Sequence, residues 1–424
     1  MQPTHTPMFP ASRLARLFLL LAMLAAGPLH AEAADPVQLP GEDLRVFLLT
    51  MGHGDELWER FGHNALWIHD AQEGTDVVYN WGLFSFDEEG FLLRFLRGEM
   101  LYWMDGVPLP VTLAEYEQRN RSVWAQELAL TPAQRAELRE FAEWNRLPQN
   151  RYYRYDYFRD NCSTRVRDAL NLVLDGALRQ EAFDAGRGTY RWHARRLVQD
   201  MFVIDRGMHI LLGPRSDVLL TRWEEAFLPK DLMELVSNTM VEGEGGAEVP
   251  LVVETRTLFE ADRPPQPAEA PGFRLGFLAF GLLAGVGLAA LSAPRFRGGS
   301  AGRWALGLAG AGWCLLAAFF GTIFVLGWLW TDHVFMHGNE NILQMNPLSL
   351  LLLPAFLGAA VSNRWVVPAR ALALVVLTLS VSGLLLKAFP GFIQSNLDVI
   401  ALTLPAHAGL AVALLRIRPD ERDR

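Results

Sequence analysis

The sequence of 424 residues predicts an α+β exported domain followed by an all-α membrane domain of about five transmembrane helices. Three observations predict this fold class. An apolar segment near the N-terminus has the form of a secretory signal, the middle of the chain has the mixed composition of a soluble domain, and residues 273–415 carry few charges. Hydrophobic residues make up 51% of the chain, which agrees with a part that enters a membrane.

Residues 1–33 are predicted to be a signal peptide. Arg13 and Arg16 precede an apolar run over 17–26, and Ala31-Glu32-Ala33 fits the small-x-small pattern before a cleavage site. The run of about 10 residues is shorter than the ~20 that a membrane-spanning helix needs. An uncleaved anchor is the alternative, against which Gly27-Pro28 would break such a helix.

The predicted exported domain covers residues 35–241 and begins with strands. Residues 44–50 (LRVFLLT) are strand-like, and a hairpin follows, with a second strand from His63 and a third over 76–83. The turn signal at 72–75 pairs His63 and Ala65 with Gly82 and Asn80. Because side chains alternate along a strand, this register places the side chains of His63 and Asn80 on one face.

A helix is predicted to begin close to Cys162. Apolar residues recur at helical spacing from Val166, and Asp160 or Asn161 can cap the helix. Cys162 then lies in the first turn, where free backbone N–H groups and the positive end of the helix dipole favour a thiolate. Arg159 and Arg165 are expected to act in the same direction. A lone cysteine is often only a small buried side chain, but Cys162 has polar neighbours and is the only thiol of an exported domain, so we favour a reactive nucleophile.

His63 is the predicted base for this thiol, because a thiol nucleophile needs a proton acceptor. His53 in a glycine-rich turn is the main rival, and His69 shares the face of His63 but lies at the turn end. His193 and His209 are predicted to be structural. A histidine, a cysteine at a helix start and a polar residue that orients the imidazole form a permuted version of the thiol-hydrolase arrangement.

The domain is predicted to end in a linker over 242–272, too rich in glycine and proline to be helical. Five membrane spans of about 16–27 residues follow. They are predicted over 275–293, 304–330, 347–362, 369–387 and 398–415.

Arginines indicate the orientation of these spans. The loops 294–303 and 363–370 contain arginines, and so does the start of the tail 416–424, whereas the loops 331–346 and 388–397 contain no Lys or Arg. Positive loops stay in the cytoplasm, so the tail is predicted to be cytoplasmic and the domain before the first span to lie outside.

Composition excludes other classes. The net charge of −9 argues against a nucleic-acid binder, which neutralises phosphates with Lys and Arg. The two cysteines, Cys162 and Cys314, are too few for a disulfide framework and lack the spacing of a zinc site. We therefore predict no metal and no cofactor.

The motifs at these positions resemble the exported domain of Lnb-type bacterial lipoprotein N-acyltransferases. The resemblance rests on Phe61-Gly62-His63, on Tyr79-Asn80-Trp81-Gly82 and on 160–165 (DNCSTR). More remotely, 63–67 and Asn161-Cys162 resemble the histidine strand and cysteine helix of the permuted NlpC-like thiol fold used by lecithin:retinol acyltransferase. Supporting stretches are 211–213, 223–229, Asp332-His333, Asn339, Asn341 and Asn346-Pro347.

The resemblance implies an acyltransferase that works in two steps. Cys162, activated by His63 and with Asn80 as the orienting residue, would take an acyl group from a membrane phospholipid as a thioester. The N-terminal cysteine amine of a lipidated lipoprotein would then accept it. The implied location is the bacterial inner membrane with the catalytic domain in the periplasm. Further substrate-binding or second-site candidates are His53, Asn161, Arg165, Asp332, His333 and Asn341.

Two other functions remain open. One is a periplasmic cysteine peptidase or amidase that acts on cell-wall peptides, and the other is a non-catalytic binding module tethered to the membrane. The peptidase would need neither five spans nor the polar outward loop over 331–346, for which a plain solvated connection is the alternative. We expect His333 and Asn341 in this loop to hold a substrate head group, or to hold the docked domain against the spans.

Overall fold

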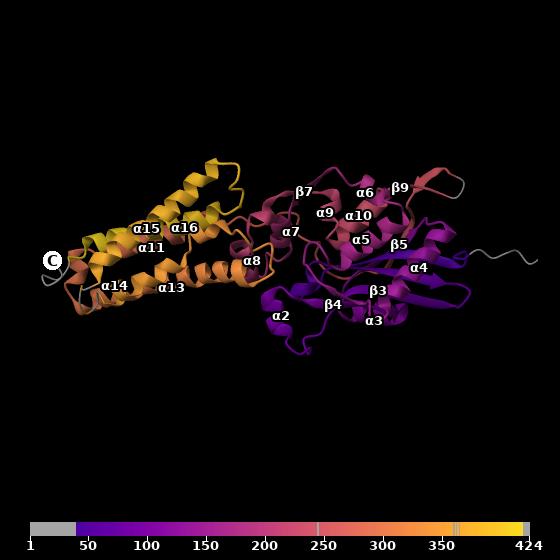
Figure 1. The fold of residues 1–424 in the computed structure, drawn as a ribbon, viewed down its shortest axis with the longest axis horizontal. Helices are drawn as coiled ribbons and strands as arrows, with labels where there is room; N and C mark the ends of the chain where they lie inside the picture. Colours follow the sequence, from indigo (N-terminus) through magenta and orange to yellow (C-terminus); the bar gives the residue numbers. More distant parts are fainter. Residues whose placement is uncertain (1–39, 244–245, 359–360, 362, 364, 419–424) are drawn as a thin grey trace, which may run out of the picture.

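The computed structural model describes residues 40–418 apart from 244–245, 359–360, 362 and 364. It has two parts placed end to end, a sheet domain over 40–259 and a helical bundle over 274–416 (Figure 1). The predicted signal peptide and the last residues of the predicted tail lie outside the described residues.

The sheet domain is built on one antiparallel sheet of seven strands, in the order β11-β5-β1-β2-β3-β4-β6. Its strands are β1 (Leu44–Met51), β2 (His63–Asp70), β3 (Thr75–Leu83), β4 (Leu101–Pro108), β5 (Val123–Leu128), β6 (Tyr152–Arg154) and β11 (Val252–Phe259). Two small sheets pair β7 (Ala185–Thr189) with β8 (Leu219–Thr221), and β9 (Met240–Glu242) with β10 (Glu248–Pro250).

The hairpin of β2 and β3 has the predicted register. Leu66 pairs with Tyr79 and Asp70 with Thr75. Continuing this register aligns Ala65 with Asn80, as expected from the turn signal. The alternating pattern explains it, because a slip by one residue would turn buried Leu66 and Tyr79 out of the core.

Helices cover both faces of the sheet. Leu138, Leu170 and Leu232, from α4, α5 and α10, join the core on one face, whereas Leu113 of α3 packs on the other (Figure 1). The longer helices are α3 (Leu109–Gln118), α4 (Pro132–Arg146), α5 (Cys162–Val173), α7 (Tyr190–Leu197), α8 (Phe202–Leu211) and α10 (Pro229–Ser237). The shorter ones are η1 (Leu57–Glu59), α2 (Phe91–Arg97), α6 (Ala177–Gln180), η2 (Pro214–Asp217) and α9 (Arg222–Glu225).

The predicted linker over 242–272 needs correction, because its middle part belongs to the sheet domain. Strand β11 pairs with β5 at the edge of the main sheet, and β10 pairs with β9. The run VVETRTLF is rich in β-branched residues and suits a strand, although glycines and prolines flank it. The longest described run without helix or strand in this region is 260–273, which contains four prolines.

Among the described residues, five helical segments of the bundle are long and apolar enough to cross a membrane. They are Arg274–Leu291, Ser300–Trp330, Glu340–Gly358, Val366–Ala388 and Leu397–Arg416. The elements are α11 (Arg274–Leu291), α12 (Pro294–Arg297), α13 (Ser300–Trp330), η3 (Glu340–Leu343), η4 (Pro347–Leu352), α14 (Leu353–Gly358), α15 (Val366–Leu385), η5 (Leu386–Ala388) and α16 (Leu397–Arg416). The third segment differs most from the prediction of 347–362, because 3₁₀ turns make up most of it and the described helix ends at Gly358.

Small residues allow the bundle helices to approach closely. A Cβ placed on Gly285 of α11 would lie 2.1 Å from the backbone oxygen of Pro405, and one on Gly409 of α16 would lie 2.2 Å from that of Gly285. Such contacts are typical of helix pairs inside membranes, where close backbone packing replaces the hydrophobic effect.

Candidate active site

Cys162 is the first residue of α5, and the helix start is firmly capped. The Asn161 side chain accepts a hydrogen bond from the Thr164 backbone N–H at 3.0 Å, and the Thr164 hydroxyl lies 2.8 Å from the Asn161 backbone nitrogen. As a whole residue, Cys162 is only partly buried. Cys162 therefore combines a fixed position, a helix N-terminus and access for a substrate.

His63 and Asn80 meet across the hairpin. His63 Nε2 lies 3.1 Å from Asn80 Oδ1, and the amide nitrogen of Asn80 donates to the carbonyl of Val78 at 3.2 Å. Because the amide oxygen only accepts, His63 Nε2 carries the hydrogen. Nδ1 is then the ring nitrogen left to exchange a proton with Cys162.

The charges of Cys162 and His63 stabilise each other. Burial raises the pKa of the thiol, but the charge of His63 and hydrogen bonds from His63, the Asn64 backbone and Ser163 outweigh this effect and lower it to about 7. Burial lowers the pKa of the His63 imidazole, but the thiolate of Cys162 raises it to a net value above normal. This mutual effect favours a thiolate and imidazolium pair.

Gly82 has no side chain and so leaves room for Cys162 beside the end of β3. A Cβ on Gly82 would lie 3.4 Å from the Cβ of Cys162 and 3.7 Å from the Tyr153 hydroxyl, and the φ of Gly82 is +90°. This left-handed backbone favours glycine. The last residue of the YNWG motif thus keeps the end of the strand open for the helix start.

Three further residues near the thiol escaped the sequence analysis. Tyr153 is buried, and its hydroxyl has no hydrogen-bond partner among the described residues. Asn64 fixes the strand beside the thiol by donating to the Leu49 carbonyl at 3.1 Å. Arg121 is buried and donates to the Gly52 carbonyl, and its charge lowers the pKa of the His63 imidazole. The aromatic run over 152–158 includes Tyr153, and Asn64 lies in the stretch 63–67 that resembles the thiol fold, but no sequence pattern pointed to Arg121.

The rival histidines have other surroundings. Burial, followed by the charges of Lys230 and Arg263, lowers the pKa of His53. His69 Nδ1 lies 2.9 Å from an Asp76 oxygen at the turn end of the hairpin. His193 is fully buried, with Nε2 2.7 Å from a Glu225 oxygen.

Two predicted substrate contacts are already engaged within the protein. Asn161 is buried, and besides its capping bonds it donates to the backbone of Tyr157 and Phe227 at 3.0 Å each. Arg165 forms a two-pronged ion pair with Asp160 and lies over the Tyr153 ring at 4.2 Å. Asp160 offsets its charge, so the expectation that Arg165 lowers the thiol pKa lacks support.

The loop after α13 contacts the sheet domain close to the site. Asp332 forms an ion pair with Arg154. His333 Nε2 donates to the Phe95 carbonyl at 2.9 Å, and its ring stacks on Tyr157 with centroids 6.2 Å apart. His333 thus joins helix α2 to the segment that leads to Cys162.

Asn341 and its neighbours hold the bundle against the end of α8. The amide groups of Asn339 and Asn341 donate to the Ile210 carbonyl at 3.0 Å each, and Asn396 donates to Asn341 Oδ1 at 2.8 Å. His209 Nε2 lies 2.7 Å from an Asp398 oxygen.

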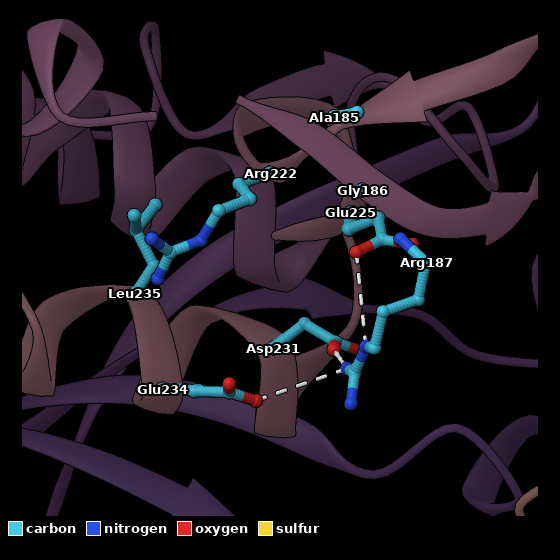
Figure 2. Close-up of a pocket in the computed structure, with 8 residues that line it drawn as sticks. All are labelled: Ala185, Gly186, Arg187, Arg222, Glu225, Asp231, Glu234 and Leu235. Carbon is cyan, nitrogen blue, oxygen red and sulfur yellow. Dashed lines mark hydrogen bonds and ion pairs between the residues drawn. The ribbon is translucent and has the colours of Figure 1, made fainter. Parts of the chain in front are cut away.

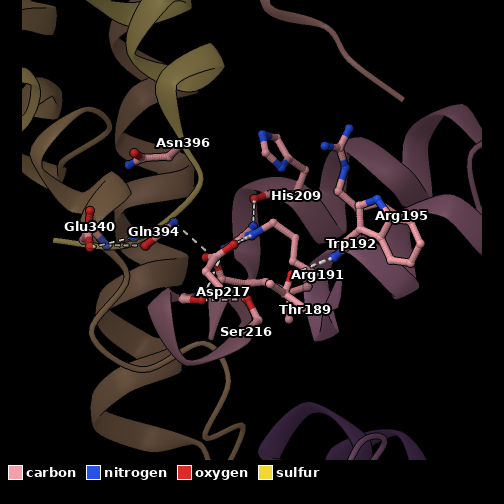
Figure 3. Close-up of polar contacts among 12 residues, drawn as sticks. Thr189, Arg191, Trp192, Arg195, His209, Ser216, Asp217, Glu340, Gln394 and Asn396 are labelled. Atoms are coloured by element: carbon pink, nitrogen blue, oxygen red, sulfur yellow. Dashed lines mark hydrogen bonds and ion pairs between the residues drawn. The ribbon is translucent and has the colours of Figure 1, made fainter. Parts of the chain in front are cut away.

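Arg191 reinforces the contact between α8 and the bundle from the sheet-domain side. Figure 3 shows it between Asp217 and the C-terminal end of α8, where it donates to the backbone of His209. Gln394 reaches the Leu212 carbonyl at 3.2 Å from the bundle side. We call these contacts between the bundle and the end of α8 the junction. Its residues are Arg191, His209, Asn339, Asn341, Gln394, Asn396 and Asp398.

A separate polar pocket lies beside β7 (Figure 2). Arg187 crosses it to form ion pairs with Asp231 and Glu234. None of the predicted site residues lines it. Among the described residues, no group of three or more His, Cys, Asp or Glu side chains has an arrangement that could hold a metal ion.

Comparison with known proteins gave one match. Residues 32–198 match the family described as the Lnb N-terminal periplasmic domain, which includes His63, Asn80 and Cys162. No curated protein and no solved structure matches the chain significantly. The part of the chain that carries the candidate active site therefore matches the same family that its histidine and cysteine motifs resemble.

Proposed function

We propose that this protein is a lipoprotein N-acyltransferase with a thioester intermediate on Cys162. The observation that carries the proposal is the pairing of His63 with a partly exposed thiol at a helix N-terminus, where the pKa of the thiol is lowered to about 7. Such a thiol is a nucleophile at neutral pH. The family of the domain and the five apolar segments beside it support a membrane-bound substrate.

In the first step, the Cys162 thiolate attacks the carbonyl carbon of a phospholipid ester. The ester C–O bond breaks, the lysophospholipid oxygen takes a proton from the His63 imidazolium, and the acyl group remains as a thioester. Asn80 holds the imidazole through Nε2. Backbone N–H groups at the start of α5 are suited to stabilise the oxyanion, and so is the Tyr153 hydroxyl, which has no partner among the described residues.

In the second step, the α-amine of the N-terminal cysteine of a lipoprotein attacks the thioester. The C–S bond breaks, an amide forms, and His63 accepts the proton that the amine loses, so that the thiolate and imidazolium pair is restored. The reaction runs forward because an amide is more stable than a thioester. No group other than the two substrates is consumed.

The test uses the full-length protein in proteoliposomes of phosphatidylethanolamine with isotope-labelled acyl chains. Intact-mass spectrometry is expected to show one acyl group on Cys162 that neutral hydroxylamine removes. Addition of a diacylated lipopeptide should then transfer the label to its N-terminal amine. If Cys162 reacts with iodoacetamide but neither adduct forms, the acyltransferase assignment is wrong, and release of cell-wall peptides would favour the peptidase alternative.

The proposal includes an orientation in the inner membrane. The arginines at 295, 297 and 303 should lie in the cytoplasm with the C-terminal tail, and the loops that contact the sheet domain should lie outside. Alkaline phosphatase fused after Arg297 should therefore be inactive, whereas a fusion after His337 should be active. The reverse pattern would place the candidate active site on the wrong side of the membrane.

A further inference from the structure

Helix α2 of the sheet domain exposes a row of leucines. Leu92, Leu93 and Leu96 are 68%, 48% and 51% exposed, and no residue of α2 is buried. At about 100° per residue, these three side chains fall on one side of the helix. This leucine face is unusual for a surface in contact with water, because three adjacent large apolar side chains remain uncovered.

The opposite side of α2 is fixed to the protein. Phe91 stacks on Phe84, with centroids 6.0 Å apart, and contacts the edge of Phe86. Arg94 on this side forms an ion pair with Glu88 and donates to the Glu89 carbonyl at 2.7 Å. The helix is therefore held in place, and its leucine face points outward as a consequence of packing.

Contacts with the end of α13 fix the position of α2 along the long axis of the bundle. The Asp332 backbone nitrogen donates to the Arg97 carbonyl at 2.7 Å, and the Arg97 guanidinium lies 5.1 Å from the Trp330 ring centroid. Trp328 and Trp330 in the last turn of α13 are both at least half exposed. Exposed tryptophans at the end of a membrane span mark the interface between lipid and water.

Figure 1 shows α2 on the side of the sheet domain that faces the bundle. Helix α2, which carries the leucine face, therefore lies against the end of α13, where Leu329 between the two tryptophans is 79% exposed. Because the leucine face adjoins this exposed apolar end of a candidate membrane span, a lipid bilayer is the partner that suits it.

We propose that α2 lies in the membrane interface, with Leu92, Leu93 and Leu96 among the lipid acyl chains and Arg97 at the level of the phosphates. A short helix with one apolar face and a flanking arginine suits this position. The contact goes beyond the proposed function, because it depends on the position of α2 and not on the chemistry of Cys162. It makes the sheet domain a membrane-seated domain rather than a soluble domain on a tether.

A series of aromatic rings connects α2 with the neighbourhood of the thiol. Phe84 beneath α2 stacks on Tyr102 at 4.9 Å, Tyr102 stacks on Tyr155 at 4.2 Å, and the charge of Cys162 acts on Tyr155. Under the proposed function, an acyl chain that leaves the bilayer at α2 would meet apolar rings on its way to Cys162.

The first experiment measures the depth of α2 in the full-length protein. A nitroxide on Leu96→Cys in a Cys162→Ser background, in liposomes of phosphatidylethanolamine and phosphatidylglycerol, should be more accessible to oxygen than to a water-soluble nickel chelate. Trp144→Cys on α4 is the control, because Trp144 is 55% exposed and α4 lies at the far side of the sheet domain (Figure 1). The remaining thiol, Cys314, is fully buried.

Each other outcome would overturn the proposal. A label on residue 96 that is as accessible to the nickel chelate as the control would place α2 in water. A label that neither reagent reaches would show that a protein surface covers the leucines. Neither readout needs a functional thiol, so failure of the proposed function would not be mistaken for failure of this one.

A second experiment tests the consequence for lipid access. The double substitution Leu92→Glu with Leu96→Glu should reduce acyl loading of Cys162 from bilayer phospholipid by about tenfold, because charged side chains leave the acyl region. Alkylation by iodoacetamide and loading from a short-chain water-soluble ester should not change, and Trp144→Glu should not affect any of the three. An equal loss of acyl loading from both donors would mean that the substitutions impair folding and not access to lipid.

Discussion

The thiol site and the junction both gather polar side chains, but they use them differently. At the junction, Asn341 and His209 are fully enclosed, and the contacts of Asn341 fix backbone carbonyls or other side chains. At the thiol site, Cys162 is partly exposed, and Tyr153 has no partner among the described residues. Polar groups that are enclosed and that connect two parts of the chain stabilise a structure, whereas a partly exposed cysteine paired with a histidine is available for chemistry.

The most severe test of this difference is Cys162→Ser. A serine hydroxyl has almost the same size but remains protonated at neutral pH, so acyl loading of residue 162 should fall by about 10³-fold or more. The thermal unfolding midpoint should stay within about 2 °C, because a serine of nearly the same volume fills the same space and can keep hydrogen bonds to the same neighbours. Acyl loading by mass spectrometry and a thermal melt give the two readouts, and retained loading would remove Cys162 from the site.

The second test concerns the base. His63→Ala should reduce acyl transfer by about 10²- to 10⁴-fold. In the protein without substitutions, the rate of Cys162 alkylation should rise with pH, with a midpoint of about 7, because deprotonation creates the reactive thiolate. Without His63 only burial and weaker hydrogen bonds act on the thiol, so the midpoint should move to higher pH.

His53→Ala is the matched control for this test and should keep measurable turnover and the original alkylation profile. If His53→Ala were inactive and His63→Ala active, the base would be His53 and the meaning given to the Asn80 contact would be wrong.

The third test lies between the two regions, at His333. His333→Ala removes the hydrogen bond to Phe95 and the stacking on Tyr157. Acyl loading from phospholipid should fall by about tenfold, because α2 and the segment before Cys162 lose their common contact. Alkylation of Cys162 should stay normal, and His69→Ala should affect neither reaction. Normal loading in His333→Ala would make the loop a simple connection.

The smallest change is expected at the junction. Asn341→Ala removes two buried hydrogen bonds and leaves the Asn396 amide without an acceptor, which should cost about 1–3 kcal/mol of stability. Thermal unfolding should begin a few degrees lower, with unchanged alkylation of Cys162. Ser349→Ala is a suitable control, since Ser349 is buried and its hydroxyl has no partner among the described residues. Equal effects of the two substitutions would show that the Asn341 bonds do not stabilise the junction.

Local patterns predicted the core of the candidate site. Alternation and a turn signal determine the register that brings Asn80 to His63, and a capping residue with helical periodicity places Cys162 at N1 of α5. Both are short-range properties of the chain. Tyr153 and Arg121 could not be found in this way, because their positions near the thiol depend on how β6 and the segment before β5 pack against it.

The errors in the predicted fold also have a physical cause. Strand β11 was missed because its pairing partner β5 lies more than a hundred residues earlier, and the prolines after it suggested a tether. The third membrane segment was placed too late because periodicity does not distinguish 3₁₀ turns from an α-helix. The contacts of Asn339 and Asn341 with α8 depend on the docking of two separate parts, which no local pattern encodes.

The position of β11 sets the order in which the protein can be made. The strand that completes the sheet comes last in the domain, and the first membrane segment begins only 15 residues after Phe259. When β11 emerges from the translocation machinery, α11 is therefore already at the point of entry into the bilayer. A fragment that stops before Val252 would leave the edge of β5 unpaired and open to other strands, whereas the charged Glu254 and Arg256 of β11 protect that edge in the complete chain. Under the proposed orientation, we therefore expect the sheet to be completed at about the time when the first apolar segment enters the bilayer.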